Sequence, residues 1–267
     1  MTKNSKFFSK QMKVVLLVAF LFLLVSLTVR ADNASNVDNQ IFTGKGLKVG
    51  VVQGGIGSTS MLKALREAEG IDAQPLTFEF LRGIDGQNTK IVSPLNKAMI
   101  DQCQVLVLPL THRREGKRID FSLTTYIAEF VNNGGGLIMT AGLPKMAIGK
   151  YSDVCVFKRH SDSGVITPWQ VTCEHPVTAG IALQEEYTVT PYCVDFTVGA
   201  NGIALAENLE TGNPTLVVGP HGKGRFVSCG MLIGATERSK DTKLTTEQNK
   251  LIINAVTWCG EKEEQLL

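Results

Sequence analysis

The stretch that decides the fold runs from residue 104 to residue 142 and reads QVLVLPLTHRREGKRIDFSLTTYIAEFVNNGGGLIMTAG. An apolar run, Val105–Leu110, is followed by charged residues, by apolar residues at helical spacing, and by a second apolar run, Leu137–Thr140. This order of strand, loop, helix and strand is typical of a parallel α/β sheet, in which ligands bind outside the carboxyl ends of the strands. Thr111 and Gly142 follow two such ends, and we expect the functional site there.

A second strand–turn–helix unit lies upstream of this stretch. The apolar run Leu47–Val52 leads into a glycine-rich turn, and Ser58 is the predicted N-cap of a helix that ends at Gly70. Free backbone N–H groups point outward at a helix N-terminus, so the turn is compatible with an anion site. It is also compatible with a tight turn that needs glycine for its geometry alone, because neither GxGxxG nor GxxxxGK(S/T) is present.

The remaining elements alternate between strand and helix up to Gly142, after which short strands predominate. Between the two units we predict a strand over Gln74–Phe80, a loop over Gly83–Lys90 and a helical turn over Leu95–Met99, and within the second unit a helix over Asp120–Asn132. The later predicted strands include Val165–Val171, Tyr187–Thr190, and a β-meander over Ile203–Glu207, Pro214–Val218 and Arg225–Ser228. A capping box at Thr245 begins the final helix. We therefore predict an α/β fold with a doubly wound, mostly parallel, flavodoxin-like sheet flanked by helices, and an added antiparallel β-meander in the C-terminal half.

The N-terminal segment has the pattern of a secretory signal. Four lysines precede the apolar run Val14–Val29, and Val29-Arg30-Ala31 offers small residues at the usual cleavage positions. We expect a signal peptide over residues 1–31, a flexible linker over 32–44 and a single α/β domain over 45–262. The chain is then exported, to the periplasm or the extracellular space. The alternative is an uncleaved membrane anchor, because the apolar run is only slightly shorter than the roughly 20 residues of a span.

The charge balance depends on this segment. It holds five of the 27 basic residues and no acidic residue, so its removal changes the net charge from +2 to −3. An acidic mature chain gives no reason to expect a nucleic-acid partner, and no membrane span is expected after signal cleavage.

Six cysteines remain in the mature chain, which allows up to three disulfides in an exported protein. Cys155, Cys173 and Cys193 cluster in the irregular middle of the sequence, where a bridge is plausible. Buried free thiols are the alternative for the cysteines within apolar elements. There is no CxxC spacing, so we expect neither a zinc cluster nor a thioredoxin-type redox motif, and no metal or other cofactor.

Three stretches together carry a family resemblance. They are residues 48–70 (KVGVVQGGIGSTSMLKALREAEG), residues 105–142, and the pair EHPVTAGI at 174–181 with GKGRFV at 222–227. The chain resembles the class I glutamine amidotransferase-like superfamily over most of its mature length. It is most similar to non-amidase branches, namely the domain related to the N-terminal part of some biotin-protein ligases and the trehalose-utilisation (ThuA-like) group.

The sequence departs from the amidase members of that superfamily at the nucleophile. The resemblance implies a Gly-x-Cys-x-Gly elbow after the fourth strand and a later His-x-Glu. The elbow position here reads Ile138-Met139-Thr140-Ala141-Gly142, so Thr140 stands in place of the cysteine, and no His-x-Glu occurs. An internal threonine hydroxyl is a poor nucleophile without an activating base. We therefore expect no glutamine hydrolysis.

The candidate site residues follow from these strand ends. His112 and Glu115 are a candidate acid–base pair beside arginines that suit a carboxylate or phosphate, although the same charges are typical of a solvated loop. We expect His175, before Pro176, to shape a turn and His221, in a hairpin, to be exposed. The candidate ligand-binding residues are Gln53, Gly54, Gly55, Ser58, Thr111, Arg113, Thr140 and Gly142.

The expected function is that of an exported amidotransferase-like domain without its catalytic cysteine. Such a domain is a non-amidase binding or accessory protein for a small polar ligand or a protein partner. The alternative is a hydrolase or carbohydrate-processing enzyme of the ThuA-like type that uses His112 and Glu115, an interpretation that rests on analogy between folds. A structural domain of a larger exported assembly is a third alternative.

Overall fold

The computed structural model describes residues 41–53, 55–76, 79–82, 89–92, 95–110, 121–141, 149–160, 166–189, 193–235 and 241–261. All of them belong to one compact unit, Ile41–Leu267. The predicted signal peptide lies outside the described residues. Within the described ranges, no helix has the length and apolar character that a bilayer crossing requires.

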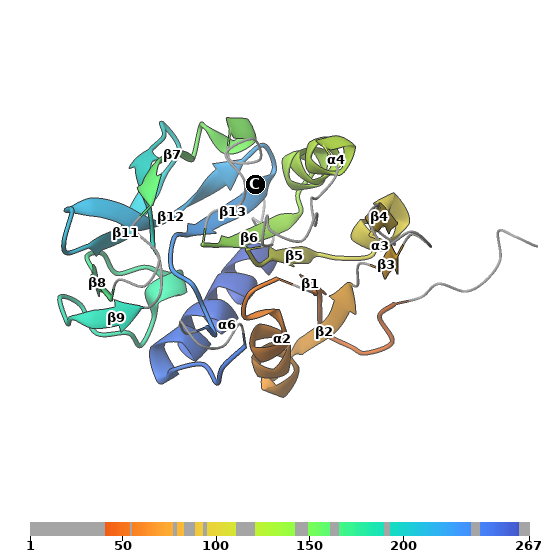
Figure 1. The fold of residues 1–267 in the computed structure, drawn as a ribbon, viewed down its shortest axis with the longest axis horizontal. Coiled ribbons are helices and arrows are strands. Elements are labelled where there is room, and N and C mark those ends of the chain that lie inside the picture. Colours follow the sequence, from red (N-terminus) through yellow and green to blue (C-terminus); the bar gives the residue numbers. More distant parts are fainter. Residues whose placement is uncertain are drawn as a thin grey trace, which may run out of the picture. The chain divides into compact units, whose positions relative to one another are not determined.

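A nine-stranded mixed sheet forms the centre of this unit, in the order β2-β1-β5-β6-β13-β12-β11-β8-β9 (Figure 1). The five strands from β2 to β13 are parallel, and every neighbouring pair from β13 to β9 is antiparallel. These strands are β1 Leu47–Val52, β2 Ile71–Leu76, β5 Val105–Leu108, β6 Gly136–Thr140, β8 Thr167–Val171, β9 Tyr187–Val189, β11 Ile203–Asn208, β12 Asn213–His221 and β13 Gly224–Cys229. The α/β character and the added antiparallel strands are confirmed.

Helices cover both faces of the parallel segment. All residues of β5 and β6 are buried, as expected for parallel strands packed on two sides. Val105 and Val107 belong to the hydrophobic cluster that includes helices α2 and α6, whereas Leu106 and Leu108 belong to the cluster with α3 and α4. Figure 1 shows α2 and α6 together on one side of the sheet. The helices are α2 Ser58–Glu67, α3 Lys97–Ile100, α4 Phe121–Asn132 and α6 Thr246–Gly260.

Two short sheets complete the described strands, β7 Cys155–His160 with β10 Val194–Val198, and β3 Glu79–Arg82 with β4 Thr89–Val92. Strand β10 carries a buried carboxylate, Asp195, whose side chain is only 1% exposed. It accepts hydrogen bonds from Asn208 Nδ2 at 3.0 Å, Thr211 Oγ1 at 2.8 Å and Asn213 Nδ2 at 3.2 Å. These donors satisfy the charge and tie β10 to the turn between β11 and β12.

The predicted strand over Gln74–Phe80 is wrong in its extent. Strand β2 already begins at Ile71, because it pairs with Leu47 at the start of β1, and it ends at Leu76. Strand β3 then begins at Glu79 and pairs with β4, which starts within the predicted loop Gly83–Lys90. The partner strands set these boundaries, and a local pattern does not contain them.

The prediction for His175 is confirmed, whereas the prediction for His221 is wrong. His175 caps the short 3-10 helix Pro176–Thr178, since its Nδ1 accepts a hydrogen bond from the Val177 N–H at 3.1 Å, which confirms the predicted turn. The predicted exposure of His221 is wrong, because its side chain is only 17% exposed and lies 2.9 Å from Asp153. Strand β12 continues to this residue by pairing with β13, so the hairpin turn is shorter than expected.

The turn between β1 and α2 depends on a glycine that no other residue can replace without strain. Gly57 has φ 74°, and a Cβ there would lie 1.8 Å from the carbonyl oxygen of Ile233. Gly212 has a similar φ of 63°, but no atom lies within 4 Å of its Cβ position. We expect Gly212→Ala to lower the free energy of unfolding by about 1 kcal/mol through strain alone. Gly57→Ala should lower it by roughly 3 kcal/mol or more, because strain and backbone overlap act together.

Urea unfolding of both variants measures the difference. Equal losses for the two alanines would show that the β1–α2 turn does not pack against the segment after β13 as described.

Candidate functional site

The carboxyl end of β6 carries the turn that corresponds to the predicted elbow. Ala141 follows Thr140 with φ 54°, a left-handed conformation that is uncommon for a residue with a side chain. The Ala141 N–H donates to the carbonyl of Cys229 at 2.7 Å, which holds the turn against the end of β13. The left-handed residue therefore lies one position after Thr140, and its methyl group has no reactive atom.

Thr140 itself is fully buried. Its hydroxyl oxygen has no hydrogen-bond partner among the described residues. A burial of this kind costs free energy, and no base of the described part of the chain is hydrogen-bonded to the hydroxyl to activate it.

The turn between β1 and α2 has a different cap from the predicted one. The N-cap of α2 is Gly57, which offers no side-chain hydrogen bond, and Ser58 is the first helical residue, only 2% exposed. The prediction that Ser58 caps the helix is therefore wrong. The left-handed φ of Gly57 makes the chain enter the helix one residue earlier than a serine cap would.

The helix N-terminus already holds a carboxylate from the same chain. Asp241 Oδ1 accepts hydrogen bonds from the Thr59 N–H at 3.1 Å and the Ser60 N–H at 3.3 Å. Gly55 packs so closely that a Cβ there would lie 2.8 Å from the Cβ of Pro109. The tight-turn interpretation is therefore favoured over an anion site, and Asp241 supplies the negative charge that the helix dipole favours.

The structure brings together few of the predicted site residues. Gln53 donates a side-chain hydrogen bond to the carbonyl of Val51 at 3.1 Å. Neither Gln53 nor Thr140 lines the pocket between β9 and α6 that is described next. Groups of three metal-ligating side chains are also absent from the described ranges. The predicted residues that lie outside the described part are Gly54, Thr111, His112, Arg113, Glu115 and Gly142.

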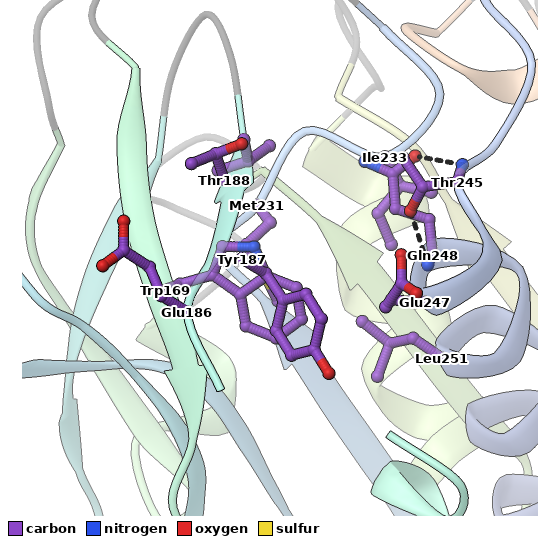
Figure 2. A pocket seen from close by; sticks show the side chains of 11 residues that line it. Trp169, Glu186, Tyr187, Thr188, Met231, Ile233, Thr245, Glu247, Gln248 and Leu251 are labelled. Atoms are coloured by element: carbon purple, nitrogen blue, oxygen red, sulfur yellow. Dashed lines mark hydrogen bonds between the residues drawn. The ribbon is translucent and has the colours of Figure 1, made fainter. Parts of the chain in front are cut away.

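A pocket of about 250 Å³ lies between strand β9 and the start of helix α6 (Figure 2). Met231 and Ile233 reach it from the segment that follows β13, so it lies at the carboxyl side of the parallel strands. Its volume is slightly below the usual range for small-molecule sites, about 300–1,000 Å³. The lining residues are Trp169, Glu186, Tyr187, Thr188, Val189, Met231, Ile233, Thr245, Glu247, Gln248 and Leu251.

The strand side of the pocket is aromatic and the helix side is polar. The ring centroids of Trp169 and Tyr187 are 5.0 Å apart, at an angle of 37°. On the helix side, Thr245 Oγ1 accepts from the Gln248 N–H at 3.2 Å, and Gln248 Oε1 accepts from the N–H groups of Thr245 at 3.4 Å and Gly234 at 3.3 Å. This reciprocal pair confirms the predicted capping box and fixes the rim of the pocket.

Sequence reasoning missed this pocket because its two aromatic residues come from different short strands. The strands themselves were predicted, but Trp169 and Tyr187 become neighbours only through the antiparallel register of β8 and β9. The conspicuous local signal was the capping box, which already fixed Thr245 and Gln248 at the start of the last helix.

All six cysteines are free, so the predicted bridge among Cys155, Cys173 and Cys193 is not formed and the buried-thiol alternative holds. Only Cys173 is partly exposed. Burial raises the pKa of the other five thiols, to about 12 for Cys103, about 11 for Cys155, about 12 for Cys193 and Cys229, and well above its usual range for Cys259. A raised pKa keeps these thiols protonated near neutral pH, so none is a thiolate nucleophile.

No protein-family model and no curated protein sequence matches the chain. Among solved structures, a protein from Parabacteroides merdae described as ThuA-like has 15% identity and a TM-score of 0.54, over 81% of this chain and 90% of that one. A protein from Thermoplasma acidophilum described as part of a GMP synthase has 15% identity and a TM-score of 0.52, over 81% of this chain and 96% of that one. A β-galactosidase from Bacillus circulans has 13% identity and a TM-score of 0.53, over 81% of this chain but 31% of that one. The chain therefore shares the amidotransferase-like and ThuA-like fold.

The burial of the thiols predicts a simple labelling pattern. At pH 8, iodoacetamide should modify the native chain at Cys173 alone, because a pKa of about 11 or more leaves at most about one thiolate in a thousand at the other positions. Mass spectrometry counts the added groups, and Cys173→Ser should remove the label.

The same chain unfolded in guanidinium without reductant should take six labels. Fewer than six would show that a disulfide is present, and a second fast label on the native chain would contradict the described burial.

Proposed function

We propose that this chain is a non-amidase, amidotransferase-like protein that binds a small polar ligand at the carboxyl side of its sheet. The observation that carries the non-amidase part of the proposal is the turn after β6, where the buried Thr140 stands in place of the cysteine and the left-handed Ala141 follows it. Neither side chain has the thiol that forms the thioester in glutamine hydrolysis. The doubly wound, flavodoxin-like winding of the parallel segment and membership of a non-amidase branch are parts of the same proposal.

The pocket between β9 and α6 supports binding as the retained function. It is concave and combines apolar and aromatic side chains with polar side chains from a capped helix end, as small-molecule sites usually do. It also lies on the side of the sheet where open α/β folds bind ligands. An accessory role is compatible with the same fold, since the similar region of the β-galactosidase is only part of a larger chain.

Export of the chain belongs to the proposal as well. It rests on the lysine-rich start and apolar run of the first 31 residues. Six free thiols do not oppose it, because five of them are buried away from oxidants. No contact of the described residues favours a protein partner in place of the small ligand. His112 and Glu115, which the alternative hydrolase would use, lie outside the described residues.

A thermal-shift screen tests the proposed function. The purified chain is mixed with sugars, sugar phosphates, nucleotides, amines and divalent metals, and the melting temperature is recorded. A ligand at one hundred times its Kd adds about 2.7 kcal/mol, which raises the Tm by roughly 5–10 °C for a domain of this size. Tyr187→Ala should abolish the shift, because Tyr187 lines the pocket.

The matched control is Tyr126→Ala, since Tyr126 lies on α4 at the other face of the sheet. His112→Ala and Glu115→Ala form a further pair that should keep the shift. Loss of the shift in that pair would move the site to the end of β5, and a flat response to every ligand would count against any small-molecule function. Ammonia release from glutamine would refute the non-amidase assignment.

A further inference from the structure

The proposed function does not name the chemical class of the ligand, but the residues that line the pocket favour one class. Resting on that proposed function, we propose that the pocket binds a small organic ammonium ion, with the charged nitrogen at Glu247 and the apolar body beside Tyr187 and Leu251. Figure 2 shows the two sides of this arrangement, with Trp169 and Tyr187 on the strand side and Glu247 and Leu251 on the helix side.

The negative charge of the lining residues disfavours an anionic ligand. Glu186 and Glu247 are acidic, and no lysine, arginine or histidine is among the described residues that line the pocket. A phosphate or carboxylate would therefore enter a site of its own sign without a compensating donor charge.

Glu247 is the carboxylate available to a ligand. It is partly buried in the first turn of α6 and has no ion pair or hydrogen-bond partner among the described residues. Lys250, which follows within one turn, donates instead to the carbonyl of Gly180 at 2.6 Å. Glu186 is exposed, and Figure 2 shows its carboxylate on the side of β9 that faces away from Tyr187. A partly buried carboxylate without a partner favours a cation close to it.

The aromatic residues suit the same ligand. The Tyr187 hydroxyl accepts from the Ala182 N–H at 3.2 Å and donates to Glu185 at 3.3 Å, so the ring is held in position. Burial raises the pKa of Tyr187, and the charges of Glu185 and Glu247 raise it further, so the hydroxyl remains neutral. A cation near the face of a tyrosine or tryptophan ring is attracted by the ring quadrupole.

A sugar fits the pocket less well, because two polar atoms at the start of α6 already accept backbone hydrogen bonds and much of the remaining wall is apolar. Thr245 Oγ1 and Gln248 Oε1 accept hydrogen bonds from the backbone at the start of α6. Four further lining residues form an apolar and buried surface, namely Val189, Met231, Ile233 and Leu251. A polyol would leave several hydroxyl groups without partners there, whereas an ammonium ion needs one carboxylate and an apolar surface.

Paired titrations test the proposal on the purified chain. Isothermal calorimetry compares choline with its uncharged isostere 3,3-dimethylbutan-1-ol, and benzylamine with benzyl alcohol. We expect at least one cation to bind about tenfold more tightly than its neutral counterpart. Glu247→Gln keeps the shape of the side chain and removes the charge, so it should lower the affinity for the cation about tenfold and leave the neutral analogue unchanged.

Glu129→Gln is the matched control, because Glu129 is an exposed acid on α4, and it should bind as the unmodified chain does. Tyr187→Leu serves as an independent variant that removes the ring. Equal affinities within both pairs, or an unchanged cation affinity in Glu247→Gln, would overturn the proposal. A sugar or nucleotide that raises the Tm while both cations fail would refute the ammonium ligand and leave the binding function standing, whereas failure of every ligand refutes both.

Discussion

The rest of the structure depends on the parallel pairing of β5 with β6, from Val105 opposite Gly136 to Leu108 opposite Met139. Both strands are completely buried, so helices must cover both faces before the pair is stable in water. Gly136 lets helix α6 pack closely on one face, because a side chain at this position would overlap the helix: its Cβ would lie 2.6 Å from the Cβ of Cys259. Close packing of that helix also places its N-terminal end at the carboxyl side of the sheet.

That placement explains how a turn without a nucleophile coexists with a pocket. The left-handed Ala141 is held by the end of β13, so the turn geometry is kept by backbone contacts that need no particular side chain. The N-terminus of α2 is closed by Asp241, whereas the N-terminus of α6 borders the cavity beside β9. The proposed ligand site therefore lies at the same edge of the sheet, displaced toward the antiparallel strands.

Local sequence patterns predicted a structural element correctly where the physical cause of that element is local. The buried parallel strands appear as continuous apolar runs, and the capping box at Thr245 and the turn at His175 involve residues within three positions of each other. Predictions failed where the cause is a distant partner. Ser58 loses the cap to Gly57, whose packing partner is Ile233, and His221 is covered because it reaches Asp153.

The sequence by itself determined the α/β class, the added antiparallel strands and the absence of a cysteine at the elbow, because each is encoded in a contiguous run of residues. Only the tertiary structure decided which side chains share a cavity. Trp169, Tyr187 and Glu247 lie far apart along the chain and meet through strand register and helix packing. Such contacts depend on the summed geometry of the sheet, and no short segment of sequence contains that information.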